Sequence, residues 1–350
     1  MTTPASALSP SPDGGNDSRG MGRYLLVLAF LCLLTAGLFV GSLFTGRSPG
    51  TLLDLFLGVA VDDPQTLWLI FSEIRLPRAL LATVVGATLG LAGAALQGYL
   101  RNPLAEPGLV GASSTAALGA VLMLYTGAST WFPMALPLGG IAGAIIGLAL
   151  VTLLAGSSSG ALTLILAGVA INTLAAALTS LALNLAPSPY AALEIIFWLL
   201  GSLADRSFEH VRVALPFMLV GWVLMLRLGR ALDALSIGEE AASSLGFHLA
   251  RLRLLLLLGV GLSVGAAVAV SGAIGFIGLV VPHLLRPLVG HRPGALLPAS
   301  ALGGAALTLA ADIGVRLLSP GTELKLGVLT ALIGAPFFLY LLVSMRRTAR

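Results

Sequence analysis

Long apolar runs, separated by short polar segments, dominate this chain of 350 residues. Ten runs carry few or no charged residues, and a helix rising about 1.5 Å per residue needs about 20 residues to cross a hydrocarbon core of about 30 Å. The ten runs are 24–44, 77–100, 108–126, 135–155, 162–186, 211–228, 254–270, 275–289, 295–313 and 324–344. They do not alternate polar and apolar residues, as the strands of a membrane barrel would. The pattern predicts an all-α integral membrane protein with about ten transmembrane helices.

Composition supports this prediction. Hydrophobic residues make up 57% of the chain and charged residues 10%, and the mean hydropathy is +1.00, which is too apolar for a soluble domain of this length. The single cysteine, Cys32, rules out an internal disulfide framework. The pI is near 9.7, but the basic residues stand at the ends of apolar runs instead of forming a face, so nucleic-acid binding is excluded.

The polar ends define the domain boundaries and the orientation. Residues 1–22 are rich in Ser, Pro, Gly and Asp and are expected to form a disordered cytoplasmic tail. Residues 23–346 form one transmembrane domain, and 347–350 a cytoplasmic C-terminal tail. A cytoplasmic N-terminus places 12 of the 19 basic residues inside, and this bias favours that orientation. These 12 are Arg19, Arg23, Arg101, Arg227, Arg230, Arg251, Arg253, Arg286, Arg292, Arg346, Arg347 and Arg350.

Energy must come from outside this chain if it transports uphill. A phosphate-binding loop needs a lysine after its glycines, and the only lysine, Lys325, lies at the start of the last run. Proton or ion coupling would predict ionisable groups near the bilayer midplane, whereas the acids fall at or near helix ends. We therefore expect a transport subunit that is not itself an enzyme and is driven by a separate ATPase.

Several short motifs resemble one transporter family. They are Arg75-Leu76-Pro77-Arg78, Leu96-Gln97-Gly98, Asn102-Pro103-Leu104-Ala105-Glu106-Pro107-Gly108 and Gly111-Ala112-Ser113-Ser114. Together with later segments they are similar to the permease subunits of FecCD-type ABC importers, which carry iron-siderophores, haem and cobalamin. The resemblance implies ten helices, a homodimer or a pair with a related permease, two cytoplasmic ATPase subunits and an external substrate-binding protein.

The longest internal polar stretch, 230–253, is predicted to be a pair of short cytoplasmic coupling helices around two glycines. Its spacing resembles the EAA-x-x-x-G motif with which importer permeases contact their ATPase, although the longer consensus is missing. An amphipathic helix that ends in a glycine turn can lie in a groove of such a partner. The alternative is an ordinary solvated loop. The residues assigned to ATPase coupling are Gly238, Glu239, Glu240, Ala241, Ala242 and Gly246.

Arg75 and Arg78 flank Pro77 at the predicted outer end of a helix, where guanidinium groups can make bidentate contacts with carboxylates. The resemblance implies that they, with Arg316, bind acidic residues on the substrate-binding protein. The alternative is that they extend to lipid headgroups.

The prolines on either side of Leu104-Ala105-Glu106 keep that segment out of both neighbouring helices. The resemblance implies that Asn102 and Leu104 help to form a cytoplasmic gate, with the loop 157–163 as a second element. The alternative is a simple turn between two helices.

We therefore predict an inner-membrane permease that moves ferric-siderophore, with haem or cobalamin as alternative cargo. An ion-coupled secondary transporter is the alternative from another class, and a membrane enzyme would need convergent catalytic side chains that the sequence does not offer. We predict no cofactor and no metal site, because the four histidines lack paired spacing. These histidines are His210, His248, His283 and His291.

Overall fold

The computed structural model describes residues 14–46, 64–132, 134–156, 160–318 and 324–348, and no strand occurs in these ranges. Helices account for most of them, as the apolar runs predict. Their bounds are α1 Gly14–Phe44, α3 Pro64–Leu69, the π-helix η1 Ile70–Arg75, α4 Leu76–Leu100, α5 Ala112–Tyr125, α6 Ala128–Trp131, α7 Ala135–Ala155, α8 Ala161–Asn184, α9 Pro189–Leu199, α10 Phe208–Leu226, α11 Gly229–Ile237, α12 Glu239–Ser244, α13 Leu249–Ser271, α14 Ile277–Leu285, α15 Pro293–Leu318 and α16 Leu326–Thr348.

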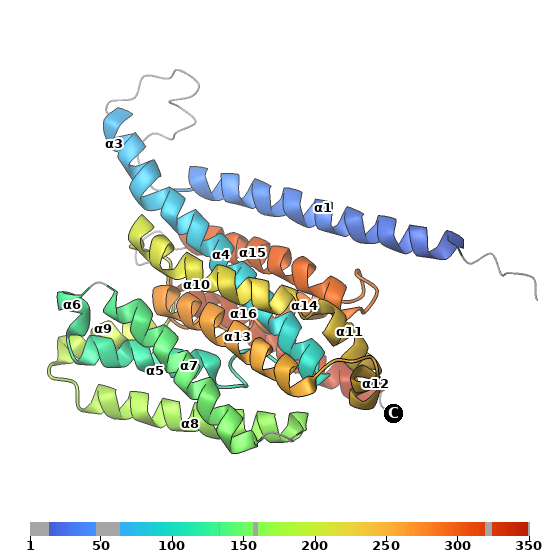
Figure 1. Cartoon of the computed structure of the whole chain (residues 1–350). Coiled ribbons are helices and arrows are strands. Elements are labelled where there is room, and N and C mark those ends of the chain that lie inside the picture. The colour runs from blue at the N-terminus through green and yellow to red at the C-terminus, as the bar shows by residue number, and fades with distance from the viewer. Residues whose placement is uncertain (1–13, 47–63, 133, 157–159, 319–323, 349–350) are drawn as a thin grey trace, which may run out of the picture.

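Helix α4 is the central element of the bundle (Figure 1). It packs most extensively against α15 and also contacts α14, α13 and α10, so most of its residues are buried. Close approach requires glycine here, because a methyl group at Gly90 would lie 2.0 Å from the carbonyl oxygen of Ser300 on α15. Gly93 meets the backbone of Gly278 on α14 in the same way. These glycines therefore form a packing face on which α15 and α14 approach α4 closely.

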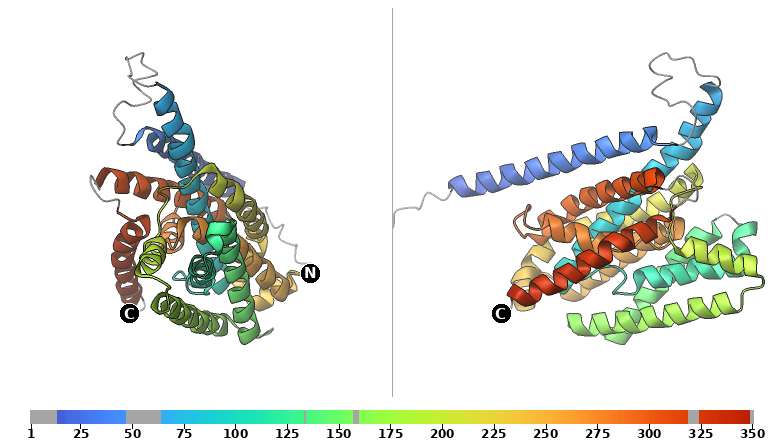
Figure 2. Two further views of the ribbon diagram at one scale, coloured as in Figure 1. Left: turned by 90° about the vertical axis from the view of Figure 1, so that its left-hand side faces the viewer. Right: turned by 180° about the vertical axis from the view of Figure 1, so that it is seen from behind.

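The remaining helices surround this centre. α5 packs against α7, where Gly143 allows the two backbones to touch at Thr115. In the views of Figure 2, α1 and α8 run along opposite edges of the molecule. α1 is only slightly covered by protein, as suits a helix that faces lipid.

Seven helices among the described residues are long and apolar enough to cross a membrane. α5, α9 and the part Leu326–Leu341 of α16 are shorter apolar helices. One predicted crossing is wrong in length. Of the run 275–289, only Ile277–Leu285 form a helix, the nine-residue α14, because residues 272–276 are irregular and 286–289 form turns. Such an irregular apolar segment is tolerated where protein surrounds it, and here Ser202 N–H donates to the Ser271 carbonyl at 2.8 Å.

The helix that carries Arg75 and Arg78 also begins earlier than predicted. Helical structure is continuous from Gln65 to Leu100, over 36 residues, instead of starting at Pro77. Proline offers no N–H, and the chain accommodates it through the π-helical turn of η1, in which Leu76 N–H bonds to the carbonyl of Phe71 five residues before it. The N-terminal segment projects beyond the neighbouring helices (Figure 1).

The structure also changes the N-terminal boundary. α1 begins at Gly14, so residues 14–22 of the predicted disordered tail are helical. Residues 1–13 lie outside the described residues. At the other end, α16 extends through Thr348, two residues beyond the predicted end of the transmembrane domain at 346.

Candidate functional site at the two ends of α4

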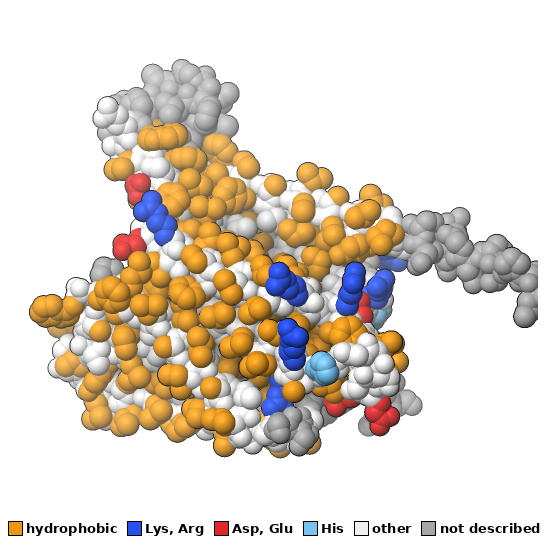
Figure 3. Space-filling model, in the orientation of Figure 1, with side chains coloured by type: hydrophobic (Ala, Val, Ile, Leu, Met, Phe, Trp, Pro, Cys, Tyr) orange, Lys and Arg blue, Asp and Glu red, His pale blue; other side chains and the backbone are white. Residues whose placement is uncertain are grey.

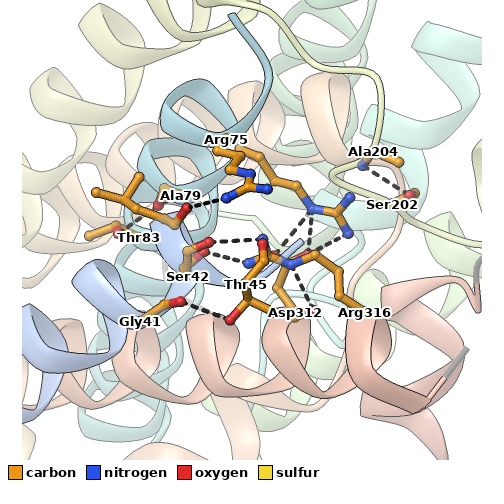
Figure 4. A network of polar contacts seen from close by, with 12 residues as sticks. Gly41, Ser42, Thr45, Arg75, Ala79, Thr83, Ser202, Ala204, Asp312 and Arg316 are labelled. Carbon is orange, nitrogen blue, oxygen red and sulfur yellow. Dashed lines mark hydrogen bonds and ion pairs between the residues drawn. The ribbon is translucent and has the colours of Figure 1, made fainter. Parts of the chain in front are cut away.

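The three arginines predicted to bind the substrate-binding protein come together in the structure. Arg78 at the start of α4 and Arg316 on α15 each form an ion pair of 2.9 Å with Asp312, whose side chain is 0% exposed. Arg75 lies one turn before Arg78, at the end of η1. We call these four residues the arginine cluster; Figure 4 shows Arg75, Asp312 and Arg316 beside Ser42 of α1.

Two of these arginines also cap the C-terminal end of α1. The last carbonyl groups of a helix have no partner within it. Arg316 donates to the carbonyl oxygens of Ser42 at 2.9 Å and Thr45 at 2.8 Å, and Arg75 donates to that of Leu43 at 3.1 Å. Positive charge at the negative end of a helix dipole stabilises it further. The arginine cluster is thus part of the fold as well as a candidate docking site.

Burial decides how much of the cluster a partner could reach. Arg75 is 6% exposed, and the side chains of Arg78 and Arg316 are 12% and 11% exposed. Three guanidinium groups against one carboxylate leave an excess of positive charge. The cluster can therefore attract acidic groups through its field, while only narrow parts of Arg78 and Arg316 are open to direct contact.

The predicted coupling helices lie at the opposite end of α4. They are α11 and α12, which meet at Gly238, and the chain turns again at Gly246. Both glycines have positive φ, 138° and 87°, which strongly disfavours other residues there. Ala242 is fully buried, whereas Glu239 and Glu240 are exposed. α11 and α12 therefore present acidic side chains to solvent and bury an apolar face.

α11 packs directly against α4, and one ion pair joins α12 to the end of α4. Arg101, the residue after α4, lies 3.4 Å from Glu239, and both side chains are about half exposed, at 45% and 51%. Arg101 itself adopts a left-handed conformation with φ 49°, which ends the helix. The predicted gate segment begins at the next residue, Asn102. The end of α4 therefore contacts α12 and leads directly into the gate segment.

The gate residues form a compact turn. The side-chain oxygen of Asn102 accepts the Leu104 N–H at 2.9 Å, and the Asn102 carbonyl accepts the Ala105 N–H at 3.1 Å. Asn102 therefore shapes the loop, and Leu104 is half-buried. Burial raises the pKa of the Glu106 carboxyl in the same loop, and a backbone hydrogen bond from Phe276 partly offsets this. Of the second predicted gate element, 157–163, residues 157–159 lie outside the described residues, and 161–163 form the start of α8.

Sequence reasoning missed two connecting residues. From the sequence alone, Asp312 is assigned no role, although its spacing of four from Arg316 is typical of a helical ion pair. Gln97 was quoted without a role. Its amide donates to the Gly278 carbonyl at 3.3 Å, which Pro282 leaves without its helical donor, and its oxygen accepts from Arg286 at 2.6 Å. Gln97 thus holds α14 to α4.

Apolar helices with polar groups at their ends, and an exposed pair of short helices at one end, are typical of a multi-pass membrane protein. A family model identifies it further, because the model described as the FecCD transport family matches residues 31–344. The chain belongs to this family, and it is a permease of an ABC importer. Permeases of this class are membrane subunits that work with ATPase subunits in separate chains.

Individual relatives agree with this assignment. The Fe(3+) dicitrate transport system permease protein FecD of Escherichia coli (strain K12) is 40% identical over 281 residues, 79% of this chain and 86% of that protein. The hemin transport system permease protein HmuU of Yersinia pestis is 40% identical over 330 residues, 92% of this chain and 96% of that protein. A solved inward-facing structure of a metal-chelate type ABC transporter superimposes with a TM-score of 0.81, at 37% identity, over 91% of this chain and 99% of that chain.

Proposed function

We propose that this permease moves ferric-siderophore across the cytoplasmic membrane. A substrate-binding protein delivers the chelate at the arginine cluster, and ATPase subunits press on α11 and α12. The N-terminus is cytoplasmic, and two permease copies, identical or related, enclose the pathway. ATP binding and hydrolysis shift the helices between two arrangements, which opens the pathway alternately to each side.

One observation carries this proposal: α4 joins the two candidate contact regions as a single rigid element. Arg78 in its first turn pairs with Asp312, and Arg101 just after its end pairs with Glu239 of α12. A helix of 25 residues spans about 37 Å, which is enough to reach from one membrane surface to the other. A movement of the coupling helices would therefore displace the arginine cluster directly, because no flexible segment lies between them.

The proposal for the cargo is based on the similarity of this chain to its relatives. One similar permease is named for ferric dicitrate and one similar structure for a metal chelate, which favours an iron chelate. Another similar permease is named for hemin, and haem therefore stays the first alternative, with cobalamin beside it. All of these are large chelates, and a permease can carry them by shape while the binding protein supplies the selectivity.

An ion-coupled secondary transporter is the alternative from another class. It would hold a buried ionisable group near the midplane. Among the described residues, the buried charged side chains are Arg75, Arg253 and Asp312. Arg253 and Asp312 lie near the ends of α13 and α15, and Arg75 lies against the C-terminal end of α1. This distribution supports ATP-driven transport.

Reconstitution into sealed vesicles tests the mechanism. Uptake of ferric-siderophore should require the cognate ATPase, ATP and the binding protein together. Uptake driven by a proton or sodium gradient, with the permease alone, would contradict the proposal. The cargo is tested separately by titrating the purified binding protein with ferric-siderophore, hemin and cobalamin. Binding of hemin or cobalamin alone would change the cargo and leave the mechanism standing.

A further inference from the structure

A basic cavity lies at the end of the molecule opposite the arginine cluster. It has a volume of about 800 Å³ and is bounded by the N-terminal part of α1, the junction of α10 with α11, and the start of α15. None of the residues assigned to docking, coupling or the gate lines it. In Figure 3, basic side chains gather on this side of the molecule, near α11 and the N-terminal part of α1.

The charge around the cavity is strongly positive. Four arginines line it, namely Arg23, Arg227, Arg230 and Arg292, and all four are exposed. Asp233 is the one acid in the lining, and it is already engaged. Its carboxylate accepts the Gly294 N–H at 2.7 Å, which caps the start of α15, and lies 3.6 Å from Arg292. The cavity therefore presents an excess of guanidinium groups, which bind phosphate oxygens well.

The rest of the lining is mostly apolar or glycine, and exposed apolar residues of α1 lie next to it. Met21 and Tyr24 of α1, Leu226 of α10 and Leu288 contribute to it. On α1 the next turn carries Leu25 and Leu26, which are 57% and 73% exposed on a helix that protein covers only slightly. A ligand in this cavity would thus have its charged part among arginines and its apolar part against the membrane-facing surface of α1.

We propose that this cavity binds the phosphate headgroup of an anionic phospholipid. Basic pockets between transmembrane helices at a membrane surface suit such headgroups. A free phosphate would satisfy the arginines equally well, but it would leave the apolar wall without a function, and so the lipid is favoured. The lipid would hold α1 against the start of α11. The packing of the coupling helices against the rest of the bundle would then depend on membrane composition.

The test measures lipid binding to the purified full-length chain. The protein is titrated in neutral detergent with short-chain phosphatidylglycerol, with phosphatidylcholine of the same chain length, and with soluble glycerol phosphate. The wild type should bind phosphatidylglycerol at least tenfold more tightly than either of the others. Equal binding of the two lipids, or glycerol phosphate bound as tightly as phosphatidylglycerol, would overturn the proposal.

A double variant locates the binding. Arg23→Gln with Arg227→Gln removes two of the four arginines and should weaken phosphatidylglycerol binding roughly 30-fold. The matched control, Arg212→Gln with Arg251→Gln, changes the same charge on exposed arginines outside the cavity and should bind as the wild type does. Equal losses in both pairs would refute a specific site.

A measurement on the wild type alone keeps the test valid if a variant does not fold. Photoactivatable phosphatidylglycerol, incorporated in nanodiscs, should crosslink to peptides from 20–24 and 226–233, and unlabelled phosphatidylglycerol should compete. Crosslinks spread evenly over the exposed helices, or confined to α8 and α16, would contradict the proposal.

Discussion

The two ends of α4 carry arginines in opposite environments. Near its start, Arg78 pairs with a fully buried carboxylate at 2.9 Å and is itself 12% exposed. Just after its end, Arg101 pairs with Glu239 at 3.4 Å, and about half of each side chain faces solvent. The first pair joins α4 to α15 inside the arginine cluster, whereas the second joins the end of α4 to a short helix at the surface.

This difference separates a fixed element from an adjustable one. A buried ion pair in low dielectric is strong but intolerant of losing one member, whereas an exposed pair contributes little and exchanges readily with water or a partner. The arginine cluster therefore offers a preformed surface, while the coupling helices can change their contacts. An importer pushed from one side needs these two properties at opposite ends.

The largest expected effect is on stability at the buried end. Asp312→Asn removes the carboxylate that Arg78 and Arg316 share and should destabilise the protein by about 3–5 kcal/mol. Thermal unfolding of the purified protein in detergent would measure this. The matched change at the other end, Glu239→Gln, should cost only about 0.2–1 kcal/mol. Similar losses from both variants would remove the contrast between the two ends.

A second effect concerns docking. Arg78→Gln keeps a hydrogen-bonding side chain but loses the charge, and a charged hydrogen bond of about 1.5–3 kcal/mol corresponds to roughly a 10- to 150-fold weaker affinity for the binding protein. Affinity would be measured by surface plasmon resonance with the permease in nanodiscs. Arg212→Gln, an exposed arginine on α10 outside the cluster, serves as the control. If both variants bind equally well, the cluster has only a structural role.

The adjustable end depends on its glycines. Gly238→Ala meets no neighbouring atom but places an alanine at φ 138°, so backbone strain of about 1–2 kcal/mol is expected. The angle between α11 and α12 should change, and the ATPase subunit should copurify in smaller amounts. Gly22→Ala, also in open space but at a helical φ on α1, should leave copurification unchanged. Equal copurification of both variants with the ATPase would argue against the coupling role.

The smallest expected effect is at the surface pair itself. Arg101→Gln should lower stability by about 0.2–1 kcal/mol, and raising the salt concentration to about 1 M should abolish even this difference from the wild type, since salt screens exposed charges. Unfolding curves at low and high salt would measure both. A loss that persists in high salt would show that Arg101 is buried in the working protein.

Much of the fold could be predicted because apolar runs record burial in lipid or protein directly. The small-residue face of α4 was recognisable from Gly86, Gly90 and Gly93. Two features were not. Hydropathy cannot distinguish a helix from an irregular apolar segment inside protein, so α14 was predicted too long. Pro77 normally starts a helix, and only the π-turn before it, which sequence rules do not anticipate, lets the helix continue back to Pro64.

The candidate sites divide in a similar way. Local features, such as the positive φ of Gly238 and Gly246, follow from residue type and spacing. Partners distant in sequence do not, and Arg78 and Asp312 are 234 residues apart. The burial of Arg75 also depends on the end of α1, which the sequence alone did not place beside it.

The unbroken helix from Gln65 to Leu100 has a mechanical consequence. At about 1.5 Å per residue its 36 residues measure about 54 Å, well above the hydrocarbon thickness of about 30 Å. Its upper turns stand clear of the other helices (Figure 1). Under the proposed function, a binding protein arriving from that side would contact these turns before the bilayer, and they would set the height and the angle at which it docks.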